Sequence, residues 1–177
     1  LFNKAKFLWS HGMTSLTYDR HKGRTNSYDV SSIGLNYRID EIRSAIGIEQ
    51  LKKLKKGNLK RKILTEKYFD NFSNSLVKMP FNNQPDNSES AFHILPVLLP
   101  RNSKRDEIMN LLKNEGIQSS IHYPPFWGFS AYKGFFKPED CPIAAHICSH
   151  ELTLPLYPTM EIEKVNEITS LVLKILR

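Results

Sequence analysis

The spacing of apolar residues predicts one long helix in the first half of the chain. Between residues 39 and 72 the apolar side chains recur at helical spacing: Ile39, Ile42, Ala45, Ile46, Leu51, Leu54, Leu59, Ile63, Leu64, Tyr68 and Phe72. They cover a wide arc, which indicates burial on more than one side of the helix, against a core and a partner. Asp40 and Glu41 occupy the first turn, where the helix dipole favours acidic residues, and Gly57-Asn58 predicts a break.

The flanking segments have different patterns. Residues 1–37 contain turn-forming Gly, Asn, Ser and Asp, which predicts a loop-rich segment with the end of a helix at residues 4–9. Residues 73–90 are polar and rich in turn formers, so they predict a connection into a new structural unit.

Beyond residue 90 the pattern alternates between strand and helix. Strand patterns cover 92–99 and 117–123, and an extended segment covers 152–158. Helical patterns cover three stretches, 104–116, 142–151 and 160–176. A capping box at 103–106 marks the start of the first stretch. An aromatic loop at 126–140 lies between the first and the second. This mixed order predicts an α+β fold.

Composition narrows the class of protein. The chain has 177 residues with 40% hydrophobic and 24% charged residues, which is typical of a globular protein and argues against disorder. No stretch of about 18 apolar residues is present, so no membrane span is expected. The chain lacks an initiator Met and a signal peptide, so we expect part of a longer protein. The cysteines, Cys141 and Cys148, predict reduced thiols in a cytoplasmic protein.

The net charge of +7 permits attraction to anions without choosing among them. Four lysines crowd one part of the predicted long helix: Lys52, Lys53, Lys55 and Lys56. Because no aromatic residues are interleaved with them, we interpret them as a solvated helix flank and expect no nucleic-acid partner.

A second cluster suggests metal or thiol chemistry. His146 and His150 share one face of a helix, but Cys148 converges poorly with them, and the ligand spacings typical of zinc are absent. A Cys–His nucleophile pair lacks any recognisable signature here as well. We therefore expect no metal site and inert thiols.

Two other segments carry candidate chemistry. In Gly34-Leu35-Asn36-Tyr37-Arg38, Asn36 either caps the following helix or donates its amide to a phosphate, with Arg38 offering a fork for a carboxylate or phosphate. His122 and Tyr123 stand at the end of a predicted strand, where sites collect, although a lone His is often structural. His11 gives a similar, weaker signal.

Taken together, several segments resemble the DegT/DnrJ/StrS sugar aminotransferases. They follow in the same order over nearly the whole chain: Trp9–Met13, Gly34–Ile42, Ala45–Leu54, Phe92-His93, Gly116-Ile117, His122–Pro125 and Leu152–Pro158. The Asn-Tyr-Arg stretch that runs into the Ala-Ile-Gly and Gln-Leu helix is the specific part of this pattern.

The resemblance implies a fold-type-I pyridoxal 5'-phosphate (PLP) transferase without its large-domain core. The chain would supply a long connecting helix and a small C-terminal α/β-sandwich domain within an α+β fold. The implied domains are the loop-rich tail of the large PLP-binding domain at 1–38, the connecting helix at 39–72 and the small domain at 73–177. The Schiff-base lysine would lie upstream of Trp9, so we expect no catalytic residue in this chain and no activity from it alone.

The reaction implied is transfer of an amino group, usually from glutamate, to a keto group of a nucleotide-linked sugar. The family also implies a homodimer through residues 34–54, with Asn36 binding the cofactor phosphate of the neighbouring subunit. The implied substrate-binding residues are Arg38, Tyr37, His122, Tyr123, Trp127 and His11.

Two departures from the family pattern concern the substrate. Trp9 stands where many members have Arg, and Trp127 stands near the place of a second His, where it could stack on a sugar or a base. Two alternatives stay open: a PLP- or PMP-dependent sugar dehydratase, and a non-catalytic basic interaction module.

Overall fold

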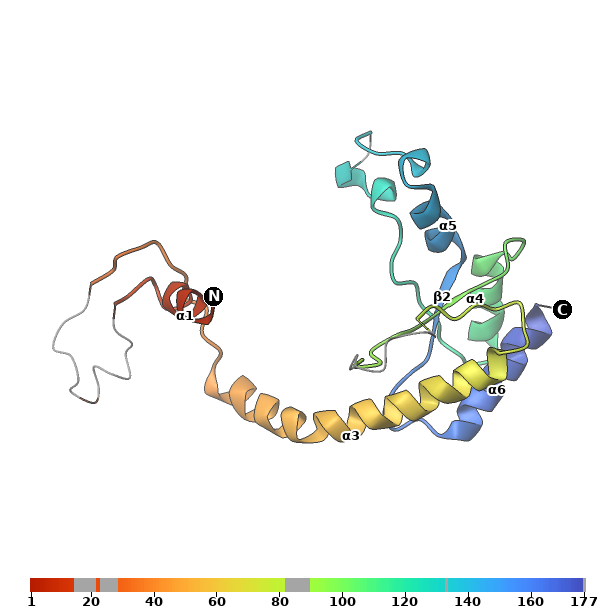
Figure 1. Cartoon of the computed structure of the whole chain (residues 1–177), viewed down its shortest axis with the longest axis horizontal. Coiled ribbons are helices and arrows are strands. Elements are labelled where there is room, and N and C mark those ends of the chain that lie inside the picture. Colours follow the sequence, from red (N-terminus) through yellow and green to blue (C-terminus); the bar gives the residue numbers. More distant parts are fainter. Residues whose placement is uncertain (15–21, 23–28, 82–89, 133, 177) are drawn as a thin grey trace. The chain divides into compact units, whose positions relative to one another are not determined.

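The computed structural model of the chain (Figure 1) describes residues 1–14, 22, 29–81, 90–132 and 134–176. The chain divides into two compact units, Leu1–Lys52 and Lys53–Arg177. Helix α3 (Glu41–Phe72) begins in the first unit and ends in the second.

The first unit contains α1 (Phe2–Leu8) and a pair of facing backbone segments. The helix begins two residues before the predicted stretch and ends at Leu8, where Trp9 caps it through its backbone N–H. The following residues then pair with the segment before α3, through isolated antiparallel bridges Ser10↔Asn36 and Met13↔Val30. The loop-rich prediction is thus correct for the described part of residues 1–37.

The start of α3 carries apolar side chains that this chain leaves exposed. Ile42 is 76% exposed and Leu51 is 69% exposed, and their apolar neighbours are similar: Ile39, Ile46, Ile48 and Leu54. The start of α3 is therefore not buried by this chain, and its expected burial against a partner stays a prediction. Only the last part of the helix, from Leu64 to Phe72, has buried residues.

The predicted break at Gly57-Asn58 is wrong, because α3 continues through it without interruption. The Arg61 side chain donates to the Asn58 side chain and, at 3.1 Å, to the backbone oxygen of Ala91. Gly57 faces Pro158, whose Cγ would lie 3.5 Å from an added Cβ. One local contact, to Asn58, and one distant contact, to Ala91, therefore support the helix at a residue pair of low helix propensity.

The second unit is built on a two-stranded antiparallel sheet. Strand β1 (Leu95–Leu98) pairs with β2 (Glu151–Leu154) so that Leu95 faces Leu154 and Leu98 faces Glu151. The predicted strand at 117–123 is wrong, since only Ser120 forms a bridge, with Thr153 of β2. Two backbone hydrogen bonds join Ser120 and Thr153, at 3.1 and 2.8 Å.

Three helices confirm the predicted helical stretches. They are α4 (Arg105–Asn114), α5 (Pro142–His150) and α6 (Ile162–Ile175). The predicted capping box before α4 is wrong, because the N-cap is Lys104 and no side chain caps the helix. The aromatic loop contains three short 3-10 turns: η1 (Phe126–Gly128), η2 (Ser130–Tyr132) and η3 (Pro138–Asp140).

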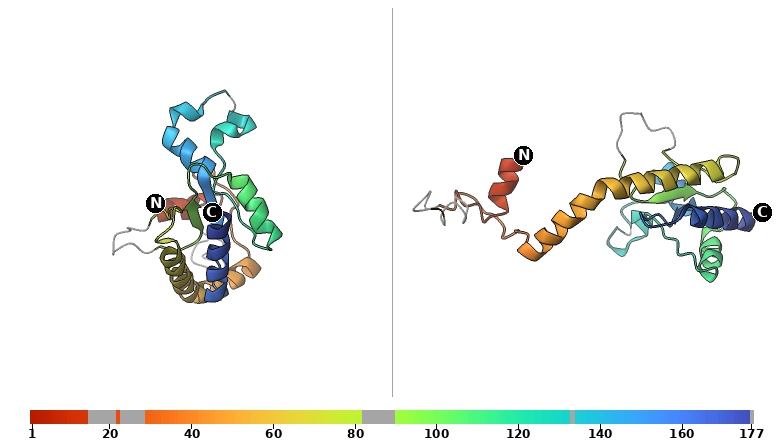
Figure 2. Two further views of the ribbon diagram at one scale, coloured as in Figure 1. Left: turned by 90° about the vertical axis from the view of Figure 1, so that its right-hand side faces the viewer. Right: turned by 90° about the horizontal axis from the view of Figure 1, so that it is seen from below.

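The core lies entirely in the second unit, among α3, α4, α6 and the sheet. Figure 2 shows α6 running beside the C-terminal part of α3, and Asn71 of α3 donates to Asn166 at 3.0 Å and to Thr169 at 2.9 Å. The buried core residues are Leu64, Tyr68, Phe72, Val77, Leu95, Val97, Leu99, Ile108, Leu112, Ile117, Leu152, Leu154, Met160, Val165, Ile168 and Val172. Among the described helices, none is long and apolar enough to cross a membrane.

Candidate functional site

Four of the predicted site residues meet where two backbone segments pair in the first unit. The His11 N–H donates to the Leu35 carbonyl at 3.0 Å, and the Tyr37 N–H donates to the Trp9 carbonyl at 2.9 Å. These bonds flank the bridge between Ser10 and Asn36. The pairing brings His11, Asn36, Tyr37 and Arg38 together although more than twenty residues separate the two segments.

Two glycines make this pairing possible. A Cβ on Gly34 would lie 2.2 Å from the Gly12 nitrogen and 2.7 Å from the Leu8 carbonyl oxygen, closer than atoms can approach. Gly12 itself has a φ of +65°, which L side chains rarely adopt. The Gly12 and Gly34 positions therefore explain why the residues on either side lie so close.

The side chains of this cluster face solvent. Asn36 and Arg38 are exposed, and Tyr37 is 77% exposed. One guanidinium nitrogen of Arg38 donates to the buried Ser10 hydroxyl at 2.8 Å, which anchors the Arg38 side chain. An amide NH₂ and a guanidinium are hydrogen-bond donors, so this donor set is suited to an anion.

The alternative role of Asn36 as a helix cap is wrong. Helix α3 begins at Glu41, and the Asp40 carboxylate accepts the Arg43 N–H at 2.8 Å. Asp40 therefore caps this end of the helix through the Arg43 N–H. The Asn36 amide is left available for another partner.

Three other predicted site residues lie in the second unit. The His122 ring contacts the Tyr123 ring edge to face, with centroids 5.0 Å apart. Trp127, in η1, packs in the same way on Phe126 at 5.1 Å. Tyr123 is 73% exposed, whereas His122 and Trp127 are half-buried. Aromatic faces at the surface suit the ring of a sugar or a base.

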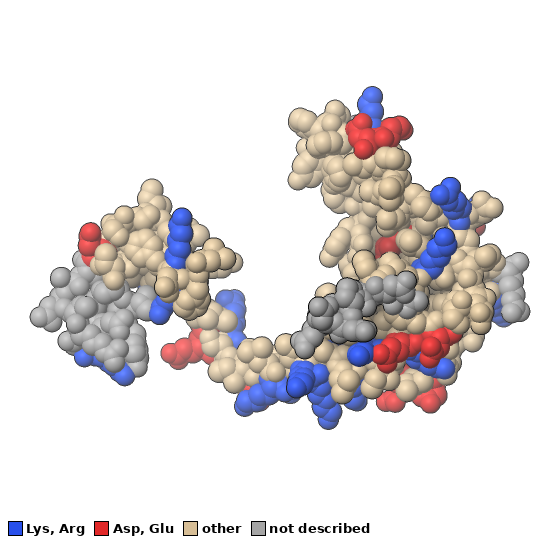
Figure 3. Space-filling view, viewed as in Figure 1, with Lys and Arg blue, Asp and Glu red and all other residues tan. Residues whose placement is uncertain are grey.

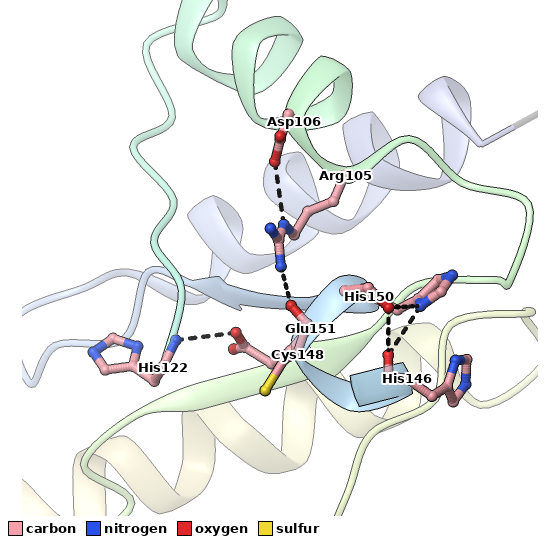
Figure 4. A network of polar contacts seen from close by, with 8 residues as sticks. Arg105, Asp106, His122, His146, Cys148, His150 and Glu151 are labelled. Carbon is pink, nitrogen blue, oxygen red and sulfur yellow. Dashed lines mark hydrogen bonds and ion pairs between the residues drawn. The ribbon is translucent and has the colours of Figure 1, made fainter. Parts of the chain in front are cut away.

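Two residues that the sequence did not single out hold His122 in place. The His122 backbone N–H donates to the Glu151 carboxylate at 3.0 Å, as Figure 4 shows. Nδ1 of the His122 ring lies 2.9 Å from the Thr153 hydroxyl oxygen. Thr153 in turn donates to Glu151. The signal in the sequence was an acidic residue directly before an apolar strand, but its burial depends on pairing that the pattern does not reveal.

A pocket of about 200 Å³ adjoins this network. It opens between the segments that flank β1 and β2, and Thr153 contributes to its wall. The residues that line it are His93, Ile94, Gln118, Ser120, Thr153, Leu154, Pro155 and Leu156. His93 and Gln118 are further polar groups that sequence reasoning did not assign to a site.

The histidines of α5 are engaged within the protein. His150 Nε2 lies 2.8 Å from the Arg101 carbonyl oxygen, and its Nδ1 lies 2.9 Å from that of His146. The pKa of His146 is lowered, mainly because burial disfavours the charged ring. The positive charges of His150, Arg101 and Lys78 lower it further. Across the part of the chain that the structure describes, no three His, Cys, Asp or Glu residues could hold a metal ion.

The predicted basic flank is visible as a band of Lys and Arg side chains along the middle of α3 (Figure 3). Its four lysines are exposed, and the Lys52 ammonium pairs with the exposed Glu49 at 2.5 Å. Such exposed ion pairs contribute little free energy.

The fold and these segments define a class of protein. The chain belongs to the DegT/DnrJ/EryC1/StrS aminotransferase family, whose model matches residues 1–173. It is 29% identical to the UDP-4-amino-4,6-dideoxy-N-acetyl-β-L-altrosamine transaminase of Campylobacter jejuni, over 99% of this chain and 45% of that protein. The chain therefore spans about half the length of the curated relatives it matches.

Solved structures share the fold. Helicobacter pylori PseC, an aminotransferase involved in the biosynthesis of pseudoaminic acid, matches with a TM-score of 0.81 and 27% identity, covering 97% of this chain and 45% of PseC. The PLP-form of Spr1654 from Streptococcus pneumoniae also matches with a TM-score of 0.81, at 24% identity, covering 96% of this chain and 42% of that one. The expected C-terminal part of a PLP-transferase fold is confirmed.

Proposed function

We propose that this chain is the C-terminal part of a PLP-dependent aminotransferase that acts on a nucleotide-linked sugar. In this reaction an amino group, from glutamate, passes to a keto group of the sugar. The observation that carries the proposal is the family match over residues 1–173, which includes both clusters of site residues. The name of the Campylobacter jejuni relative supports a UDP-linked amino sugar as the substrate class.

The first cluster fits the cofactor phosphate. Asn36 is exposed beside the anchored Arg38 guanidinium, and both groups donate hydrogen bonds. In the proposed enzyme Asn36 binds the phosphate of PLP held by the neighbouring subunit. Arg38 and Tyr37, with His11 on the paired segment, contact an acidic group of the substrate. PLP, when bound, supplies the electron sink for amino transfer.

The second cluster fits the sugar nucleotide. His122 offers a ring nitrogen for hydrogen bonding, and the exposed Tyr123 and half-buried Trp127 offer aromatic faces. These side chains orient the substrate, since a positioned keto carbon is what amino transfer requires. The Schiff-base lysine is contributed by sequence outside this chain, so the 177 residues alone are proposed to be inactive.

We further propose a homodimer formed through residues 34–54. The support is the row of exposed apolar side chains at the start of α3, including Ile42 and Leu51. Covering such a row removes apolar area from water and is typical of an obligate interface. The complete enzyme is proposed to be cytoplasmic and to serve polysaccharide biosynthesis.

The test is a spectrum of the full-length protein loaded with PLP. We expect a visible absorbance band of the bound cofactor that disappears when glutamate is added and returns when a UDP-linked 4-keto sugar is added. A band that does not respond to glutamate would contradict amino transfer. Loss of a sugar hydroxyl without gain of nitrogen would favour the dehydratase alternative instead.

A further inference from the structure

Glu151 is a buried carboxylate whose partners are hydrogen-bond donors rather than cations. Its residue is 3% exposed, and its two oxygens accept the His122 backbone N–H and the Thr153 hydroxyl. Among the described residues no cation pairs with it, and the Arg105 guanidinium in Figure 4 binds Asp106 and the Cys148 carbonyl instead. Burying a carboxylate without a cation costs free energy, so a specific role for Glu151 is worth deriving.

The hydrogen bonds around Glu151 have a fixed direction. An ionised carboxylate only accepts, so Thr153 gives its one hydroxyl proton to Glu151. The Thr153 oxygen can then only accept in its 2.9 Å contact with Nδ1 of His122. In the neutral imidazole Nδ1 therefore carries the proton, and Nε2 is left as the acceptor.

The acceptor nitrogen is available to a ligand. Nε2 of His122 makes no hydrogen bond with any described residue. His122 is half-buried, and its Nε2 is not among the buried side-chain atoms of the described residues that lack a hydrogen-bond partner. Figure 4 shows the imidazole on the opposite side of the His122 backbone from the Glu151 carboxylate. Thr153 meanwhile lines the adjoining pocket, so the network reaches the pocket wall through Thr153.

We propose that Glu151 and Thr153 are positioning residues that hold neutral His122 as its Nδ1–H tautomer, so that Nε2 accepts a hydrogen bond from a ligand hydroxyl or N–H. The ligand half of this statement rests on the proposed function, in which His122 borders the sugar-nucleotide site. The tautomer half rests on the network alone.

Glu151→Gln gives a sharp prediction because a glutamine has only one acceptor oxygen. The His122 backbone N–H is always a donor and takes that oxygen. The glutamine NH₂ then faces Thr153, whose hydroxyl turns to donate to Nδ1. The proton of the neutral ring moves through solvent to Nε2, so the substitution reverses the tautomer while preserving side-chain shape.

The experiment is ring ¹⁵N NMR of the labelled 177-residue chain at about pH 8.5, roughly two units above the ordinary imidazole pKa. We expect a protonated-type shift at Nδ1 in the parent chain and at Nε2 in Glu151→Gln. Thr153→Ser is expected to keep the parent pattern, and Thr153→Val is expected to reduce the Nδ1–H population. Exposed Glu163→Gln and Thr159→Val are the matched controls.

Two results would overturn the tautomer assignment. One is a parent chain in which Nε2 of His122 carries the proton. The other is that both Glu151→Gln and Thr153→Val keep the parent ring ¹⁵N shifts of His122 while their backbone spectra are preserved. If Glu151→Gln fails to fold, the Thr153→Val and Thr153→Ser pair decides by itself. These outcomes are independent of whether the complete protein is a transaminase.

The ligand half is tested in the full-length enzyme with a UDP-linked 4-keto sugar. We expect Thr153→Val to raise KM for the sugar about threefold to tenfold, as for one lost hydrogen bond, and Thr153→Ser to restore it. The response of the cofactor band to glutamate should not change. If Thr153→Val reduces the Nδ1–H population but leaves KM for the sugar unchanged, the proposed hydrogen bond between Nε2 and the ligand is refuted. If the parent enzyme does not respond to glutamate, the proposed function is refuted instead.

Discussion

The two units of the chain bury their apolar side chains to very different extents. In Lys53–Arg177, sixteen hydrophobic residues form a buried core around the sheet. In Leu1–Lys52, Met13 is the buried hydrophobic residue among those described, and the start of α3 exposes apolar side chains such as Ile42 and Leu51. Because apolar burial is the dominant favourable term in folding, the second unit can sustain itself, whereas the first unit needs a surface to cover it.

Separating the two units should have the largest effect on cooperative unfolding. Residues 53–177 are expected to unfold in one cooperative transition near that of the whole chain, because they retain the complete core. Residues 1–52 by themselves are expected to show no cooperative transition, since a short segment without a core is not stable. Thermal unfolding followed by circular dichroism checks both. A cooperative transition in residues 1–52 would break the comparison.

A matched pair of leucines sharpens the comparison between the two units. Leu112 of α4 is 0% exposed and Leu51 of α3 is 69% exposed, so the same Leu→Ala change samples the two regions on two helices. Leu112→Ala is expected to lower the free energy of unfolding of the chain by about 2–5 kcal/mol. Leu51→Ala is expected to change it by less than about 0.5 kcal/mol. Urea titration measures both, and equal losses would contradict the account.

Removing a single hydroxyl group from the core should have a smaller effect on the free energy of unfolding. Tyr68 is buried, its hydroxyl donates to the Pro155 carbonyl at 3.0 Å, and burial raises its pKa. Tyr68→Phe removes the donor and leaves the Pro155 oxygen unpaired, which should cost about 1 kcal/mol. Tyr157→Phe, at a residue that is 47% exposed, is the control. Indistinguishable urea midpoints would show that this bond does not stabilise the core.

The smallest expected effect depends on pH. Because the folded structure lowers the pKa of His146, its contribution to stability is present above the unfolded pKa of about 6.5 and is lost as pH falls through the folded value. His146→Gln should therefore be less sensitive than the parent chain to a change from about pH 7.5 to about pH 5.5. Urea midpoints at both values provide the measurement. A steeper dependence in the variant would have the wrong sign.

The sequence predicted the helices of the second unit because their apolar spacing follows the helical period. It misjudged features that depend on distant contacts. The 117–123 segment became a single bridge, since Ser120 pairs with one residue of β2 before two prolines end the segment. Gly57 sits inside a continuous helix because Arg61 supports that turn.

Some residues of the candidate site could be predicted from the sequence and others could not. The segments that carry Asn36 and His11 are distant in the sequence and are paired by the close approach of Gly12 and Gly34, but the family pattern drew attention to both segments. Glu151 and Thr153 were not predicted, because their role follows from strand register and from the burial of a carboxylate. Neither property is visible in a one-dimensional pattern.

The proposal that the first unit supplies a phosphate ligand is tested most directly by the affinity of the full-length protein for PLP. Fluorescence titration should give a Kd for Asn36→Ala that is at least about tenfold weaker than that of the parent, as for a lost hydrogen bond to a charged group. Asn102→Ala, at an exposed asparagine of the second unit, should leave the Kd unchanged. An Asn36→Ala protein that binds PLP as tightly as its parent would contradict the account.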